Sequence, residues 1–95
     1  MERATEKKLL ASQRDEITEH LIYKKLYQAT KDPHNKDIFK STASDELSHY
    51  NIWKEYTHQD VKPDKLKIFI YCLISRVIGV TFGIKLMEGR EAKPR

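Results

Sequence analysis

The residues Lys31-Asp32-Pro33 separate two long segments whose apolar residues recur with the period of an α-helix. Asp is favoured as the residue that caps the start of a helix, and Pro is best tolerated at the first helical position. The sequence therefore predicts one helix from about Ala4 to Thr30 and a second from about Pro33 to His58. A connection this short brings the two helices side by side as an antiparallel hairpin.

Each predicted helix carries a stripe of residues at alternating steps of four and three, which places them on one face. On the first helix the stripe consists of Leu9, Gln13, Glu16, His20, Tyr23 and Tyr27. On the second helix it consists of Phe39, Thr42, Glu46, His49, Trp53 and Tyr56. We expect the two stripes to face each other, which would bury Glu46 and His49. A buried Glu is costly unless it is paired or bound to a metal.

The heights of the two glutamates along the hairpin can be compared by counting. Glu16 lies sixteen residues before Asp32 and Glu46 fourteen after it. At about 1.5 Å rise per residue, both lie roughly 21 to 24 Å from the turn. His49 follows one turn later on the same face as Glu46. The spacing predicts a metal site made of Glu16, Glu46 and His49, with a Glu–His ion pair at a partly hydrated interface as the alternative.

The size and composition favour one small helical domain, residues 1–95. Three Gly and three Pro beside 34% charged residues are typical of a helical protein. The single cysteine, Cys72, excludes an internal disulfide and an iron–sulfur or rubredoxin-like site within this chain. Because of this cysteine usage and the highly charged N-terminal residues, we expect a cytoplasmic protein without a secretory signal.

The net charge of +4 raises the question of nucleic-acid binding. Basic residues are spread along the chain with acidic residues between them, and the densest cluster is Lys62, Lys65 and Lys67 at a predicted turn. There is no basic arm or recognition-helix pattern, so we do not expect a nucleic-acid partner.

The segment from Ile68 to Ile84 is apolar nearly all round and contains one charge, Arg76. We interpret it as a crossover from Pro63 to Ile78, with Asp64 as a cap, followed by a helix from Gly79 to Ala92. The apolar segment from Ile68 to Ile84 is just long enough to reach the lower limit for a membrane span, and Arg76 near its centre makes a span costly. Burial against a second copy is favoured, which predicts a homodimer or larger homo-oligomer. Membrane association and a following domain are the alternatives.

Several motifs resemble the rubrerythrin-type branch of the ferritin-like superfamily. They are Glu16 followed seven positions later by Tyr23, and the block Asp45-Glu46-Leu47-Ser48-His49-Tyr50. Further segments are similar to the N-terminal rubrerythrin-like domain fused to vacuolar-iron-transporter-type membrane proteins. These are Asp32-Pro33-His34-Asn35, Trp53 after the Glu46/His49 block, and Phe82-Gly83-Ile84-Lys85-Leu86-Met87-Glu88.

The resemblance implies an all-α, ferritin-like four-helix bundle with a di-iron site, manganese being the alternative metal. Glu16, Glu46 and His49 would be ligands in one half of that site, and Glu88, Glu91 and His20 are further candidates. It also implies iron oxidation, or chemistry with peroxide or dioxygen. Whether the chain is an enzyme, either a ferroxidase or a rubrerythrin-like peroxidase, stays open.

The chain departs from the family because a second Glu-x-x-His motif has no counterpart in it. A di-metal site of this kind takes about four carboxylates and two His from four helices. Either two chains assemble the bundle, or a second half of the domain is missing. Two alternative functions remain: a helical dimerisation module in which Glu46 and His49 are a structural polar pair, and a membrane-associated accessory domain of an iron transporter.

Overall fold

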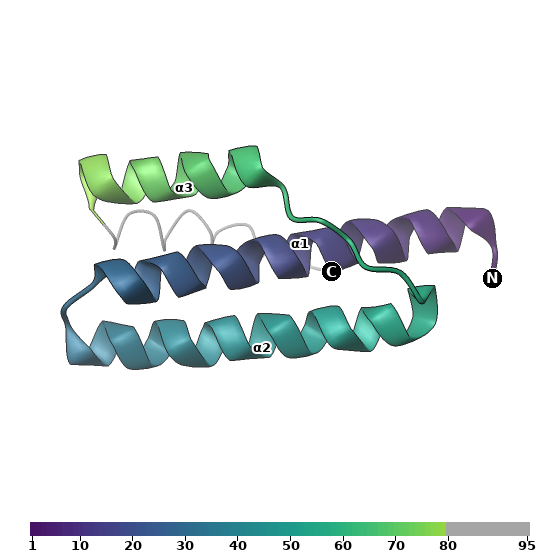
Figure 1. Ribbon diagram of the computed structural model, residues 1–95, viewed down its shortest axis with the longest axis horizontal. Helices are drawn as coiled ribbons and strands as arrows, with labels where there is room; N and C mark the ends of the chain where they lie inside the picture. Colours follow the sequence, from purple (N-terminus) through teal and green to yellow (C-terminus); the bar gives the residue numbers. More distant parts are fainter. Residues whose placement is uncertain (80–95) are drawn as a thin grey trace.

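The computed structural model describes residues 1–79, which form three α-helices and no strand (Figure 1). α1 spans Arg3–Ala29, α2 spans Pro33–Thr57 and α3 spans Lys65–Ile78. The first two pack as an antiparallel hairpin, and α3 runs back alongside α1, which lies between α2 and α3 in Figure 1. The predicted all-α hairpin is confirmed, with helix bounds within one residue of those expected. The predicted helix from Gly79 to Ala92 falls almost wholly on residues outside the described range.

The turn between α1 and α2 forms as the sequence predicts. The Asp32 carboxylate accepts a hydrogen bond from the backbone N–H of His34 at 3.2 Å, and Pro33 occupies the first helical position. Lys36 reaches back across the turn, where its Nζ donates to the carbonyl of Tyr27 at 2.7 Å and lies 4.0 Å from the centre of the Tyr27 ring. A carbonyl at the end of α1 thereby gains a partner that the helix itself does not supply.

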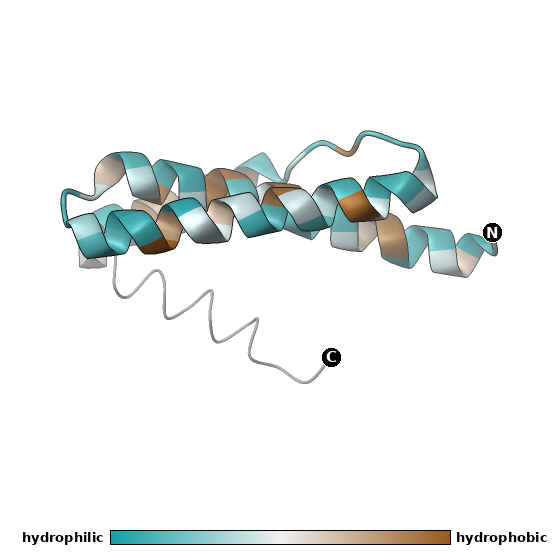
Figure 2. Ribbon diagram, turned by 90° about the horizontal axis from the view of Figure 1, so that it is seen from below, coloured by the Kyte–Doolittle hydropathy of each residue, from teal (hydrophilic) through white to brown (hydrophobic). Residues whose placement is uncertain are grey.

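The apolar core lies in the half of the hairpin near this turn. It consists of Ile22, Tyr23, Leu26, Phe39, Ala43 and Ile68. The rings of Tyr23 and Phe39 are tilted against each other with centroids 6.3 Å apart. Most of the other residues along the hairpin are hydrophilic, as the colouring of the ribbon in Figure 2 shows. The packing of this core thus fixes how α1 and α2 are aligned between the turn and the level of Glu16 and Glu46.

The predicted stripe on α2 is wrong in its second half. Tyr50 and Thr57 are buried with Glu46, whereas His49 and Tyr56 are exposed. A helix of 3.6 residues per turn returns to the same face after eleven residues, so Glu46 and Thr57 share a face. The steps of three and four that lead from Glu46 to His49 and Tyr56 place these two residues outside that buried face. The expectation that His49 is buried is therefore corrected, while that for Glu46 is confirmed.

Buried polar side chains hold the end of the hairpin away from the turn. The Thr57 hydroxyl donates to Gln13 Oε1 at 2.6 Å, and Gln13 Nε2 donates to the carbonyl of Gln59 at 2.6 Å. The connection after α2 is fixed again where the Thr18 hydroxyl accepts from the N–H of Asp64 at 2.9 Å. Asp64 then caps α3, as predicted, by accepting from the N–H of Lys67 at 3.1 Å. These bonds direct the chain across α1 and set the position of α3.

Replacing Thr57 by Val should lower the free energy of unfolding by about 1–3 kcal/mol. The valine keeps the shape but leaves the buried Gln13 Oε1 without its donor, and an unsatisfied buried group costs that much. Urea denaturation followed by circular dichroism measures the change. Thr5→Val makes the same chemical change at an exposed position of α1 and should stay within about 0.5 kcal/mol of wild type. Equal stability of both variants would show that the hydrogen bond contributes nothing.

No helix within residues 1–79 is both long and apolar enough to span a membrane. The helix α3 has 14 residues and ends at Ile78, and the following Gly79 has a φ of +116°, which residues with a side chain rarely adopt. The predicted crossover from Pro63 to Ile78 therefore corresponds to α3 and the residues just before it, and it ends at the predicted residue.

Cys72 lies half-buried on α3, against the core cluster. Burial raises the pKa of its thiol, and the nearby positive charges of Lys25 and Arg76 only partly oppose this. A raised pKa leaves less thiolate at a given pH, and the thiolate is the reactive form. Near pH 8, alkylation by iodoacetamide should therefore be several-fold slower in the folded protein than in urea. Equal rates in the two states would contradict this packing of α3.

Candidate metal centre

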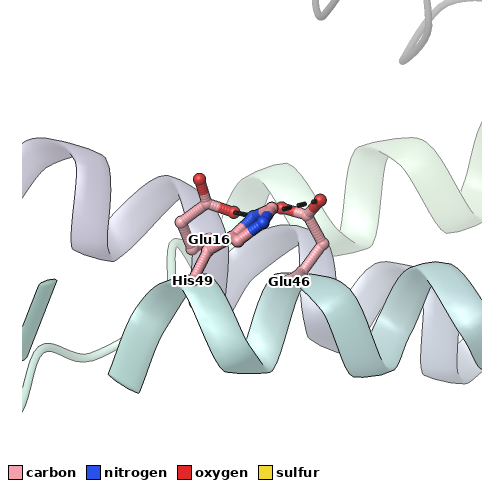
Figure 3. Close-up of side chains that lie close together, drawn as sticks. All are labelled: Glu16, Glu46 and His49. Carbon is pink, nitrogen blue, oxygen red and sulfur yellow. Dashed lines mark hydrogen bonds and ion pairs between the residues drawn. The ribbon is translucent and has the colours of Figure 1, made fainter. Parts of the chain in front are cut away.

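Three ionisable side chains meet midway along the hairpin (Figure 3). Glu16 comes from α1, and Glu46 and His49 come from adjacent turns of α2. His49 Nδ1 lies 3.3 Å from Glu16 Oε2 and 3.9 Å from Glu46 Oε1. One ligand atom from each residue lies within 4.8 Å of the other two. The structure thus brings all three predicted residues together.

The convergence follows from the local structure of both helices. The hairpin turn at Asp32 and the core around Phe39 fix the register, so that Glu16 stands level with the turn of α2 between Glu46 and His49. The agreement in height that we obtained by counting residues is confirmed. That the three side chains bind a metal stays a prediction.

The two carboxylates are much more deeply placed than the imidazole. The side chains of Glu16 and Glu46 are 14% and 11% exposed, whereas that of His49 is 50% exposed. Glu16 and His49, together with Ile52 and Trp53, also line a cavity of 170 Å³. The group therefore has a protein-facing side made of carboxylates and a solvent-facing side at His49, through which an ion can enter.

The three side chains offer donor atoms that could hold a metal ion. Two ionised carboxylates at low dielectric repel each other, and a cation between them offsets that repulsion. Carboxylate oxygens are hard donors suited to iron and manganese, and imidazole is a borderline donor that both accept. With metal–ligand bonds of about 2.1 Å, two ligands of one ion lie at most about 4.2 Å apart. The separations of 3.3 and 3.9 Å from His49 Nδ1 meet this condition, and one ligand atom of Glu16 lies within 4.8 Å of one of Glu46.

His20, the further candidate on α1, has a different role in the structure. Its Nδ1–H donates to the backbone carbonyl of Ala43 at 2.6 Å, which ties α1 to α2 one turn from Glu46. Within residues 1–79, His20 does not belong to a group of three or more metal-ligating side chains. Glu88 and Glu91, the other candidates, lie outside the described residues.

Trp53 and Ile52 line the cavity beside the metal centre but offer no metal ligand. Trp53, a member of the predicted stripe on this helix, is half-buried and lines the cavity. Ile52, which the sequence reasoning missed, is 49% exposed and lines the same cavity. Its position three residues after His49 was the available signal, because residues three apart on a helix are neighbours.

Comparison of the chain with protein-family models, with curated proteins and with solved structures gives no match. Sequence and structure together establish an all-α chain with a helical hairpin and a Glu/Glu/His group that could hold a metal ion.

Proposed function

We propose that the chain binds iron through Glu16, Glu46 and His49 and serves iron handling as a ferritin-like, di-iron carboxylate protein. One observation carries the proposal: two nearly buried carboxylates and an imidazole converge from two helices to within 4.8 Å. The side chains that would hold the metal are therefore already gathered by the packing of the hairpin.

The choice of iron is supported by the donor types and by the resemblance to rubrerythrin-type proteins. Two carboxylates and one imidazole suit iron or manganese better than the soft metals that thiolates select. A carboxylate-held iron pair, when bound, supplies the electrons that reduce dioxygen or peroxide. In this chain Glu16 and Glu46 hold and orient the metal. His49 would bind the metal from the solvent side, where Trp53 and Ile52 line the adjoining cavity.

A second copy of the chain would complete the ligand set. Three ligands are about half of what a di-metal site in a four-helix bundle takes. Beside His49 on α2, Ile52 and Tyr56 expose 49% and 57% of their surface, so exposed apolar side chains form part of the rim of the site. A two-fold interface over this rim would bring two sets of Glu16, Glu46 and His49 together and cover the apolar side chains. We infer that the functional form is a homodimer or a larger homo-oligomer.

A helical dimerisation module without metal is the second candidate. It is favoured by the 3.3 Å between His49 Nδ1 and Glu16 Oε2, a distance at which the two side chains already interact without an ion. In that case Glu16, Glu46 and His49 form a polar cluster that fixes the register of the hairpin.

Iron loading separates the two candidates. The protein is incubated with Fe(II) without oxygen, passed through a gel-filtration column and analysed for iron. We expect about one iron per chain, which is two per pair of chains. Admission of oxygen should then give the near-ultraviolet absorbance of carboxylate-bound Fe(III). Iron at the level of a protein-free control would leave the dimerisation module as the function.

A further inference from the structure

The helix α3 has an apolar face that the core does not use. Along the chain these residues follow at steps of three, one, three and four, which places them on one side of a helix. They are Leu66, Phe69, Ile70, Leu73 and Val77, with exposed fractions of 67%, 62%, 43%, 45% and 75%. The opposite side of α3, with Ile68, Tyr71 and Cys72, packs against the core.

Positive charges border this apolar face on both edges. At 100° per residue, Lys65 and Arg76 fall on one edge and Lys67 on the other. The helix contains no Asp or Glu from Lys65 to Ile78, and Lys62 adds another cation just before it. The face of α3 is therefore an apolar stripe with Lys65 and Arg76 along one edge and Lys67 on the other.

We propose that this face of α3 binds the surface of an anionic lipid bilayer. A helix that lies in the interface inserts its apolar side chains between the headgroups and keeps its cations at the level of the phosphates. The Lys and Arg side chains are long enough to extend from the edge of the face to the headgroups. With 14 residues, α3 would lie along the membrane surface.

Charge decides between a bilayer and a second copy of the chain as the occupant. If two α3 faces met, the cations along the edges of one would stand beside those of the other, and α3 offers no carboxylate to pair with them. An anionic surface meets the same cations with opposite charge. In Figure 1, α3 lies on the other side of α1 from α2, so this face is separate from the metal centre and from the exposed Ile52 and Tyr56 on α2. The inference is independent of metal binding.

Sedimentation with lipid vesicles tests the proposal. The wild-type chain should sediment with vesicles of phosphatidylcholine mixed with phosphatidylglycerol and bind those of phosphatidylcholine alone much more weakly. Each cation near the surface contributes roughly a fivefold factor in binding, so the double variant Lys65→Gln/Lys67→Gln should bind about 25-fold more weakly. Added salt should also release the protein, because it screens these charges.

The variant Phe69→Asp places a charge in the centre of the apolar face and should abolish binding. Ile38→Asp is its matched control, since Ile38 is 44% exposed on α2, and it should bind like the wild type. Circular dichroism checks that both are folded, and the lysine variant changes only side chains outside the core.

Three results would overturn the proposal. The wild-type chain could stay in the supernatant with anionic vesicles. Phe69→Asp and the lysine variant could both bind anionic vesicles as well as the wild type does. Light scattering could show an assembly of the wild-type chain that the Phe69→Asp substitution dissociates, while the wild-type chain does not bind anionic vesicles. That result would identify a second copy as the occupant of the face.

Discussion

Replacing Glu46 by Gln should remove most of the iron binding while the hairpin stays folded. Glu46 is 8% exposed, and its carboxylate lies 3.9 Å from His49 Nδ1. Glutamine keeps the shape of the side chain but loses the negative charge that attracts a cation. Losing a residue that merely orients a ligand costs 10- to 100-fold in metal affinity, so losing a ligand should cost at least about 100-fold. Anaerobic titration with Fe(II), repeated with Mn(II), measures the affinity.

Glu55→Gln is the matched control, since Glu55 is an exposed carboxylate on the same helix. It should bind iron like the wild type, whereas Glu16→Gln and His49→Ala should weaken binding as Glu46→Gln does. Equal iron uptake by the Glu46 and Glu55 variants would remove Glu46 from the site.

Added Fe(II) or Mn(II) should raise the melting temperature of the assembled protein by about 10 °C or more. A ligand at about 100 times its dissociation constant stabilises the state that binds it by about 2.7 kcal/mol. For a chain of this size, each kcal/mol corresponds to about 4–8 °C. If two chains build one site, metal must also tighten their association, because linkage is reciprocal. Calorimetric melting at several protein concentrations measures both effects.

The His49→Ala protein tests whether this stabilisation comes from the proposed site. Both copies lose the ligand at once in a homodimer, so the metal-dependent rise should vanish. An unchanged rise would place the metal elsewhere. A rise that does not depend on protein concentration would show that one chain is sufficient and would contradict assembly of the site by two copies.

The part of the fold that could be predicted depends on local signals. Asp32-Pro33 and Asp64 act within a few residues of the helices that they begin, so the helix bounds follow from the sequence. The level of Glu16 against Glu46 was predictable for a related reason: the hairpin has one short turn, and the rise per residue is constant.

The exposure of His49 and the hydrogen bonds around Gln13 could not be predicted in the same way. Which side of α2 is buried depends also on where the connection after it lies, and the Tyr50 hydroxyl accepts a hydrogen bond from the N–H of Val61 in that connection at 3.0 Å. Gln13 bonds Thr57 and Gln59, which are more than forty positions away in the sequence. Contacts of this range leave no periodic signal in either helix.

The half-exposed imidazole changes the interpretation of the site. A fully buried Glu46 and His49 would form an enclosed polar pair, whereas the structure places carboxylates inside and His49 at the surface. This arrangement leaves a route for an ion and a place for further ligands from a second copy. The sequence predicted which residues meet, and the structure adds from which side the site opens.

Anomalous diffraction at the iron absorption edge, from crystals grown or soaked with Fe(II), tests metal binding by Glu16, Glu46 and His49 most directly. The anomalous difference map locates iron without reference to the protein chain. We expect its strongest peak at about 2.1 Å from carboxylate oxygens of Glu16 and Glu46 and from a ring nitrogen of His49. A map without a peak at these three side chains, from protein that contains iron by elemental analysis, would contradict the proposed site.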